Sequence, residues 1–177
     1  MKQWLIPAAV TFLAACGGNN NPQQEKENTA EKAAQTAAPA ATTVALKNDA
    51  LNAVFEHYEK LTDALVKGDA AAAKVSAAAI ETGAPAADPS GKLAEAAQKI
   101  GAATDIEAQR GAYSVLNNTF IGLVKSTGMS SGELHVEFCP MALDNAGARW
   151  LSRSKEIRNP YFGDAMLTCG SVEETLQ

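Results

Sequence analysis

The fold is decided first by the stretch LNAVFEHYEKLTDALVKG, residues 51–68. Large apolar side chains recur in it at steps of three and four residues, which places them on one face of an α-helix. Its last two residues, Lys67 and Gly68, are typical of a helix C-terminus, where a basic side chain and then glycine are favoured. The stretch therefore predicts an amphipathic helix with one buried face. The residues of that face are Leu51, Val54, Phe55, Tyr58, Leu61 and Leu65.

Three further helices are predicted downstream, at residues 70–81, 93–100 and 106–127. Asp69 and Asp105 are placed to cap the first and the last of these helices, and Gly101 closes the short one between them. Residues 83–85 (GAP) and 88–90 (DPS) are predicted to form a connection. Four helices joined by short connections indicate an up-down bundle, and abundant alanine with few aromatic residues agrees with closely packed helices.

The last part of the chain, residues 129–170, loses the helical pattern. Within it, residues 134–138 (LHVEF) alternate like a β-strand or an extended arm. The remainder is rich in turns, and long irregular segments of this kind are commonly functional. We therefore predict an all-α fold: an up-down four-helix bundle with an irregular C-terminal arm that carries one short extended segment.

Residues 1–15 are predicted to be a lipoprotein signal peptide. They combine a positive start at Lys2 with an apolar run over residues 4–15, which is too short to span a bilayer as a helix. The run ends in Leu13-Ala14-Ala15-Cys16, which resembles a lipobox, the recognition site of lipoprotein signal peptidase. That resemblance implies cleavage before Cys16 and a lipid anchor on its thiol.

Residues 16–43 are predicted to be a disordered tether, because they hold no aliphatic side chain larger than alanine to bury. The folded domain is then expected over residues 44–177. Gly17, next to the lipidated cysteine, suits transfer to the outer membrane with the domain facing the periplasm; the inner membrane is the alternative. The membrane is thus an expected partner, reached through the lipid.

Composition and motifs exclude several classes of function. The formal net charge is −5, and Lys and Arg are scattered among Asp and Glu, so no basic stripe is available to bind nucleic acid. The sequence lacks a phosphate-binding loop, a dinucleotide fingerprint, a Gly-x-Ser-x-Gly turn and a His-Glu-x-x-His helix. No nucleophile has a general base at a readable spacing, and a Cys-x-x-Cys redox motif is absent. We therefore do not expect an enzyme.

Sulfur is concentrated in the C-terminal arm. Once Cys16 is assigned to the lipid, the two remaining cysteines are Cys139 and Cys169. One of the two histidines, His135, is there as well, and so is every methionine after Met1. These methionines are Met129, Met141 and Met166.

The spacing of these residues allows their ligand atoms to converge. Cys139 and Met141 are two residues apart and point to the same side of an extended segment. Met166 and Cys169 are three residues apart and share a face in a helical turn. If turns fold the two pairs together, four sulfurs surround one centre, with His135 as a fifth ligand. Thiolate and thioether ligands select Cu(I) or similar soft ions, so the pattern predicts a soft-metal site.

A disulfide is the competing interpretation. Exported proteins with two cysteines commonly oxidise them, and a Cys139–Cys169 bridge would close a loop of about 30 residues. In the chain-entropy model it would stabilise the fold by about 3 to 4 kcal/mol. The methionines would then be ordinary core residues. Both interpretations stay open on the residues alone, and a bridge that opens on reduction would reconcile them.

Two other features of the sequence have a structural and a functional interpretation. Trp150, Tyr161 and Phe162 are predicted to form an apolar plug that fixes the arm to the bundle; the alternative for Trp150 is a shield over bound Cu(I). His57 is predicted to lie at the surface or partly buried on the first helix. It becomes a metal ligand only if the arm packs over that helix.

Several segments of the chain resemble known proteins. They are residues 54–58, 61–66, 139–142, 147–151, 156–163 and 166–170. Together these segments are similar to an uncharacterised periplasmic domain family, which occurs as stand-alone lipoproteins and at the C-terminus of adaptor subunits of copper/silver efflux pumps. Cys139-Pro140-Met141 also resembles the start of a short heavy-metal-binding motif in those pumps, although Ala142 stands where that motif has a histidine.

The resemblance implies copper handling and favours the metal over the disulfide. We therefore expect a periplasm-facing lipoprotein that binds Cu(I) or Ag(I), either to buffer the metal or to deliver it to an efflux system. A heavy-metal efflux adaptor is the expected protein partner. The expected ligands are Cys139, Met141, Met166, Cys169 and His135.

Overall fold

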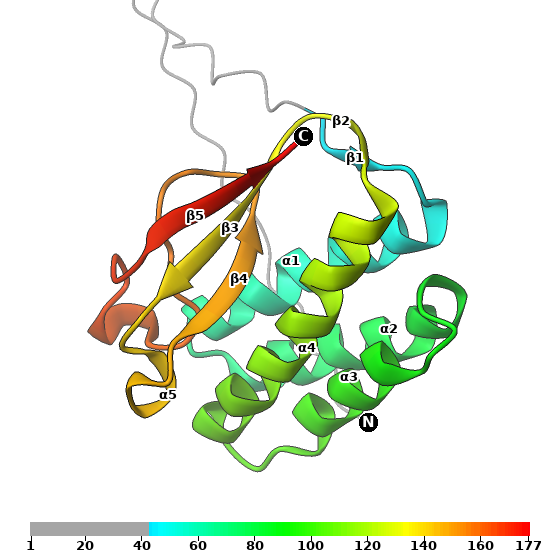
Figure 1. Cartoon of the computed structure of the whole chain (residues 1–177). Helices are drawn as coiled ribbons and strands as arrows, with labels where there is room; N and C mark the ends of the chain where they lie inside the picture. Colours follow the sequence, from blue (N-terminus) through cyan, green and yellow to red (C-terminus); the bar gives the residue numbers. More distant parts are fainter. Residues whose placement is uncertain (1–42) are drawn as a thin grey trace, which may run out of the picture. The chain divides into compact units, whose positions relative to one another are not determined.

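The structure, a computed structural model, describes residues 43–177 (Figure 1). The predicted signal peptide, the lipid-attachment residue Cys16 and nearly all of the predicted tether lie outside the described residues. In chain order the elements are β1 (Ala45–Leu46), α1 (Asp49–Val66), α2 (Ala70–Ala87), α3 (Lys92–Ala102), α4 (Ile106–Thr127), β2 (Met129–Ser131), β3 (Leu134–Cys139), α5 (Ala142–Asn145), β4 (Ala148–Ser152), η1 (Gly163–Ala165) and β5 (Ser171–Leu176). None of these helices is long and apolar enough to cross a membrane.

The four long helices lie where the sequence predicts them. A side-chain oxygen before α1, α2 and α4 accepts a backbone N–H of the first turn, which satisfies one of the unpaired donors there. These capping residues are Asn48, Asp69 and Asp105. The six residues of the predicted apolar face of α1 are at most 1% exposed, so that face forms the centre of the core.

Helix α2 runs through the stretch that the sequence predicts to be a connection. Residues 83–85 belong to α2, which ends only at Ala87. Gly83 permits a close approach to α1, because a Cβ at this position would lie 3.2 Å from Val54 Cγ2. Pro85 cannot donate a helical hydrogen bond, but the Asp88 N–H still bonds to Ala84 O at 2.7 Å and keeps the last turn closed.

The all-α prediction is wrong, because the C-terminal arm forms a sheet. Strand β3 is the centre of a three-stranded antiparallel sheet in the order β4-β3-β5, and β1 pairs with β2 in a second antiparallel sheet. The fold therefore mixes helices with antiparallel strands and is not a four-helix bundle with an irregular arm. Only β3 coincides with the predicted extended segment; β4 lies in the stretch predicted to be irregular, and β5 follows the predicted arm, in residues for which no element was predicted.

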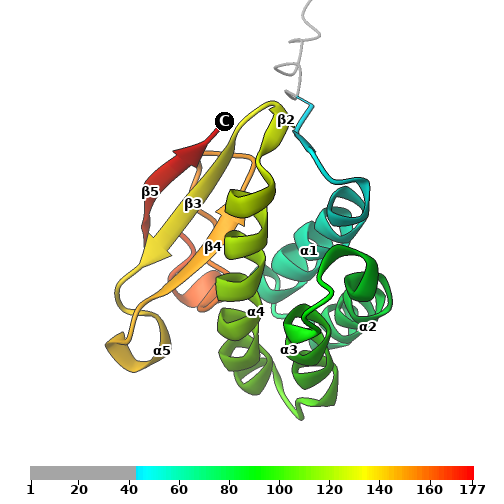
Figure 2. The same ribbon diagram turned by 45° about the vertical axis from the view of Figure 1, so that its right-hand side comes forward.

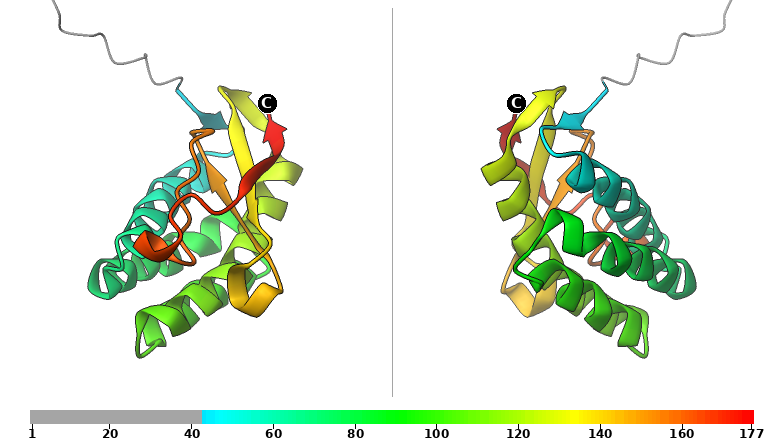
Figure 3. Two further views of the ribbon diagram at one scale, coloured as in Figure 1. Left: turned by 90° about the vertical axis from the view of Figure 1, so that its left-hand side faces the viewer. Right: turned by 90° about the vertical axis from the view of Figure 1, so that its right-hand side faces the viewer.

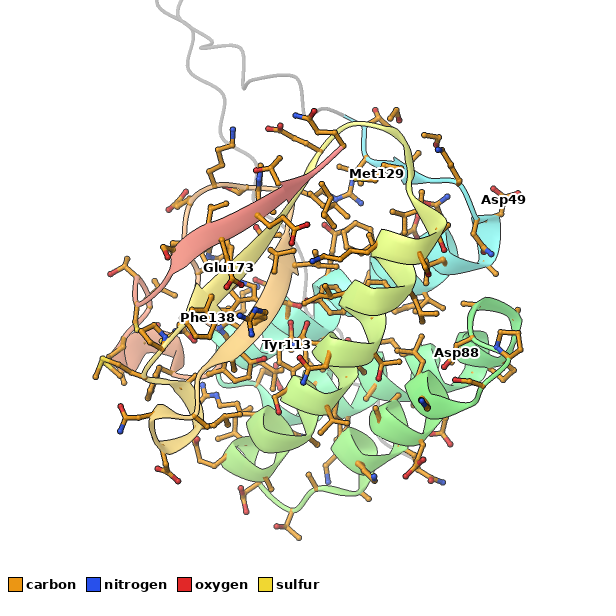
Figure 4. The ribbon with its side chains drawn as sticks, in the orientation of Figure 1. Asp49, Asp88, Tyr113, Met129, Phe138 and Glu173 are labelled. Carbon is orange, nitrogen blue, oxygen red and sulfur yellow. The ribbon has the colours of Figure 1, made fainter. Side chains whose placement is uncertain are left out.

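Strand β5 is difficult to predict from the sequence for a physical reason. β5 (SVEETL) is exposed along almost its whole length, so it lacks the apolar alternation of a half-buried strand. Cross-strand contacts hold it instead. The Arg149 guanidinium of β4 forms two bonds of 2.5 and 2.8 Å with the Glu173 carboxylate of β5 and lies 4.7 Å from the centre of the Phe138 ring on β3. Figure 4 shows Phe138 and Glu173 on these neighbouring strands.

Helix α4 joins the sheet to the rest of the helices. In Figure 2 it stands between the sheet and helices α1 to α3. Strand β4 packs on α4, and an ion pair between Lys125 and Glu174 ties the end of α4 to β5. The long connection from β4 to β5, drawn orange to red in Figure 3, passes the end of α1, which η1 contacts.

A buried hydroxyl network fastens β4 to the helices. Tyr58 Oη of α1 accepts the Leu151 N–H at 2.7 Å and donates to the Asn117 side chain of α4. Tyr161 Oη donates to Arg149 O at 2.7 Å and accepts from Asn117 Nδ2 at 3.1 Å. These two backbone groups of β4 would otherwise be unpaired beside the core. The two tyrosine side chains, linked by Asn117, thus provide the hydrogen bonds to β4 that a neighbouring strand would otherwise provide.

Tyr113 extends the hydroxyl network on the side of α4 that faces the sheet (Figure 4). Its hydroxyl lies 3.2 Å from Tyr58 Oη and 2.5 Å from Thr62 Oγ1. Burial raises the pKa of Tyr113 to about 12 and raises the pKa values of Tyr58 and Tyr161 as well. All three side chains therefore stay neutral, as hydroxyl groups that both donate and accept.

Replacing Tyr58 by phenylalanine tests this attachment. Tyr58→Phe leaves the Leu151 N–H and Asn117 Oδ1 without their hydrogen-bond partner in a buried site. We expect the free energy of unfolding, measured by urea denaturation, to fall by about 1 to 3 kcal/mol. The exposed neighbour on the same helix provides the control, because Glu56→Ala should change it by no more than about 0.5 kcal/mol. A Tyr58→Phe variant as stable as this control would contradict the assigned role.

Candidate functional site

The candidate site is the thiol pair, Cys139 and Cys169, at the end of β3. Cys139 is the last residue of β3, is fully buried, and pairs with Ala148 of β4. Cys169 lies just before β5 and is partly exposed. The two thiols lie close enough for Cys139 to raise the pKa of Cys169, and neither is in a disulfide in the structure. The fold therefore brings together two cysteines that are far apart in the sequence.

Asn159 positions Cys169. Its side-chain Nδ2 donates to Cys169 O at 2.8 Å, and its Oδ1 accepts the Tyr161 N–H at 2.8 Å. Its backbone N–H donates to Leu167 O at 2.8 Å. The following Gly170 has a φ of +136°, and a Cβ there would lie 2.9 Å from Phe138 O. Asn159 and Gly170 thus hold Cys169 close against β3.

The segment around Asn159 is itself anchored by a buried arginine of α4. Arg110 donates through Nη2 to Leu65 O at the end of α1 and through Nε to Pro160 O, both at 3.0 Å. Gly163 fits beside it only because glycine has no side chain, since a Cβ would lie 2.7 Å from Arg110 Nη2. Sequence reasoning did not assign a role to Arg110 or Asn159. The Asn-Pro-Tyr-Phe-Gly run at 159–163 is the signal that marks this turn.

Residues that follow Cys139 form an unusual turn. Leu143, Asp144 and Asn145 have φ values of 54°, 56° and 68°, a left-handed conformation that costs non-glycine residues about 1–2 kcal/mol each. At Gly147 a Cβ would lie 2.7 Å from the Phe138 ring, so the turn also passes close to β3. This strained turn begins at Met141, whose backbone N–H is close enough to the Cys169 thiol to lower its pKa slightly. Its strain lies directly beside the thiol pair.

The Cys169 thiol is uncharged near neutral pH, because its pKa is raised. Hydrogen bonding with Cys139 raises the pKa of Cys169, and burial and the charge of a Cys139 thiolate raise it further. The Met141 N–H has the opposite, smaller effect on this pKa. A thiol with a raised pKa is a poor nucleophile. The arrangement therefore suits a ligand that displaces both protons better than it suits covalent catalysis.

Not every predicted ligand reaches the thiol pair. Met141 adjoins it through its backbone, and its side chain is 49% exposed. Met166 is partly buried, and its carbonyl accepts the Cys169 N–H at 3.1 Å. Met129 is buried on β2, in the other sheet.

His135 is kept apart from the thiol pair. It lies four residues before Cys139 on β3, a separation of about 13 Å along an extended strand. Its Nδ1 is 3.1 Å from Thr175 Oγ1, and its Nε2 is 3.5 Å from Glu133. Burial lowers the pKa of His135, which favours a neutral ring engaged with β5.

The thiol pair has no further metal-binding side chains of the usual kind. Within residues 43–177, no group of three or more His, Cys, Asp or Glu side chains is placed to hold a metal ion. Any ion at the pair would therefore be bound by the two thiols with thioether help.

The predicted plug is buried only in part: Trp150 and Tyr161 are covered and meet edge to face, with ring centres 6.0 Å apart, while Phe162 is partly exposed.

Comparison with known proteins concerns mainly the helical part of the chain. Residues 54–132 match a family described as "Protein of unknown function (DUF3347)", which is less than half of the 177 residues. The match runs from α1 to the turn after β2 and ends before Cys139. No curated protein and no solved structure matches the chain.

Alkylation rates test the environment of the thiol pair. In a full-length Cys16→Ser chain, which leaves only these two cysteines, iodoacetamide at pH 8 should modify both at least about tenfold more slowly than in urea. Cys139 is shielded because it is fully buried, and Cys169 reacts slowly because its raised pKa lowers its thiolate concentration. Peptide mass mapping gives the two rates separately. Asn159→Ala should accelerate the reaction of Cys169, and the exposed-site variant Glu56→Ala should not. Equal rates in folded and unfolded chains would contradict the described environment.

Proposed function

We propose that this protein binds a soft monovalent metal ion, Cu(I) or Ag(I), at the thiol pair. The observation that carries the proposal is that the fold brings the free thiols of Cys139, at the end of β3, and Cys169 close enough to interact, which gives two neighbouring sulfur donors. An ion that replaces the two protons would be held by two thiolates at once. Met141, in the turn after Cys139, supplies a thioether as the next donor, and Met166 is a candidate for a fourth.

The chemistry of these donors favours a soft ion. Thiolate and thioether ligands select Cu(I) over magnesium, calcium and manganese, which prefer oxygen. A structural zinc site takes four Cys or His ligands. Among the described residues no third such side chain joins the thiol pair. A site of two thiolates and one or two thioethers therefore fits Cu(I) or Ag(I) best.

The exposure of the donors suits uptake and release of the ion. Cys139 is fully buried, Cys169 is partly exposed, and Met141 is 49% exposed. An ion can therefore arrive at the Met141 thioether and move inward to the thiolates. Because the outer ligand is a weak, accessible thioether, a partner protein can remove the ion by ligand exchange. Such a site fits metal buffering or delivery better than a permanent structural role.

The N-terminal sequence sets the location at which this would happen. A lipid on Cys16 would hold the protein at the outer membrane, facing the periplasm, with residues 16–43 as the tether. The resemblance of the domain to the tail of copper/silver efflux adaptors points to such an adaptor as the recipient. The function proposed is thus a lipid-anchored carrier or buffer of Cu(I) or Ag(I) that serves an efflux system.

Titration with Cu(I) tests the site directly. The full-length Cys16→Ser chain, reduced and titrated against bathocuproine disulfonate, should bind one ion. Cys139→Ser/Cys169→Ser should lower the affinity by about 100-fold or more, and Met141→Leu by roughly tenfold. Loss of a residue that only hydrogen-bonds to a metal ligand typically costs about 10- to 100-fold in metal affinity, and loss of a ligand itself should cost at least as much. The matched control is Met129→Leu, which should stay within about twofold. Equal affinity in the double serine variant and its parent would remove the proposed site.

The affinity for Cu(I) should rise with pH. The metal binds thiolates, whereas the raised pKa of Cys169 keeps its thiol protonated near neutrality, so binding must release protons. Between pH 6 and pH 8 we expect the apparent affinity to increase, by up to about 100-fold per pH unit if two protons leave. The double serine variant serves as the control and should show no such dependence. A pH-independent affinity of the parent would show that the thiols are not the ligands.

A disulfide is the alternative, because two adjacent thiols can also be oxidised. The domain would then be a stapled module that binds a protein partner without metal. The mass of the exported protein separates the two functions. Two free thiols with bound copper agree with the carrier, whereas a loss of two hydrogens that mild reductant does not reverse would favour the stapled module.

A further inference from the structure

A cleft separate from the thiol pair lies between α1, β4 and the connection after β4. It has a volume of about 220 Å³. Glu59 and Asp63 of α1 and Arg153 and Arg158 of the connection are among its charged lining residues. Two lining residues from the sheet, Glu137 and Trp150, are buried and therefore form its inner end. They face each other across β3 and β4 in the strand register.

The charges at the outer end of the cleft are already paired. Arg153 forms two bonds of 2.5 and 2.8 Å with the Glu59 carboxylate. Asp63 is 2.5 Å from Lys67 Nζ and 3.6 Å from Arg158. Each of these side chains is partly exposed to water and already has a partner of opposite charge. The pairs therefore form the rim of the cleft, and none of them needs a ligand to balance its charge.

Glu137 at the inner end is different. It is 0% exposed, and neither of its carboxylate oxygens has a hydrogen-bond partner of ordinary geometry. A buried acceptor without a donor is costly, and a buried charge without a counter-ion is more so. An apolar side chain at the centre of β3 would pack there without that penalty. Among its described neighbours, the Trp150 indole offsets the effect of burial on the pKa of Glu137 only in part.

We propose that the cleft binds a small organic cation with N–H donors, a primary amine or a guanidine, with Glu137 as its counter-ion. Both carboxylate oxygens need a donor, and an ammonium or a guanidinium supplies two N–H groups, the latter in a parallel pair. The Trp150 indole offers an aromatic surface for the cation beside this carboxylate. At about 220 Å³ the cleft admits only a small molecule.

The single tryptophan of the folded part makes this site easy to observe. The chain has two tryptophans, Trp4 and Trp150, and Trp4 lies in the predicted signal peptide. In a full-length Trp4→Phe chain all tryptophan fluorescence comes from the inner end of the cleft. Titration with propylammonium and with ethylguanidinium should give a saturable change. Propan-1-ol, which has no charge, and tetramethylammonium, which has no N–H, should bind about tenfold or more weakly.

Variants of the cleft complete the test. Glu137→Gln keeps the shape and removes the ionisable group. At pH 9, where the Glu137 carboxyl is ionised because its pKa is about 8, the substitution should weaken the binding of both N–H cations by about tenfold or more. Glu56→Gln, at an exposed position of α1 outside the cleft lining, is the matched control and should stay within about twofold. The proposal is overturned if the parent gives no saturable response, if propan-1-ol matches propylammonium, or if Glu137→Gln binds as well as its parent. The comparison among ligands uses the parent chain alone, so its result does not depend on whether the Glu137→Gln variant folds.

Discussion

The hydroxyl network on the outer side of β4 is the interaction on which the rest of the structure depends. The Leu151 N–H and Arg149 O need partners that no fourth strand provides, and Tyr58 and Tyr161 supply them. Asn117 links the two hydroxyls, so α1, α4, the connection and β4 share one set of buried hydrogen bonds. Because each group is desolvated, the loss of one partner leaves others unsatisfied.

This attachment explains how an irregular segment can present a defined site. Tyr161 belongs to the turn at 159–163, which Arg110 also holds through Pro160 O. Within the same turn Asn159 binds the carbonyl of Cys169. The position of the second thiol is therefore set by residues of α1 and α4, far from it in the sequence. The thiol pair depends on the helical core, although neither of its cysteines belongs to a long helix.

Strand β3 carries Glu137 and Cys139 close together, although the two residues belong to different proposed sites. Glu137 and Cys139 are two residues apart and so point to the same side of the strand. Cys139 finds a partner in Cys169, whereas Glu137 has none, and desolvation raises the pKa of Glu137 to about 8, an effect that the Trp150 indole offsets only in part. The central strand, which is almost entirely buried, thus carries both one thiol of the pair and a carboxyl group without a hydrogen-bond partner.

The sequence by itself determined the helices, because their apolar spacing, their capping residues and Gly68 act within a few turns of chain. It also identified β3 and the two cysteines, but not strands β4 and β5. The exposed residues of β5, such as Glu173 and Glu174, carry no apolar alternation, whereas β4 is a short, mostly buried strand inside a turn-rich stretch. Those strands exist only because β3 offers hydrogen bonds from distant residues. The tertiary structure alone decided that Cys139 and Cys169 meet, that His135 stays apart, and that Glu137 is buried unpaired, since such contacts depend on packing rather than on spacing.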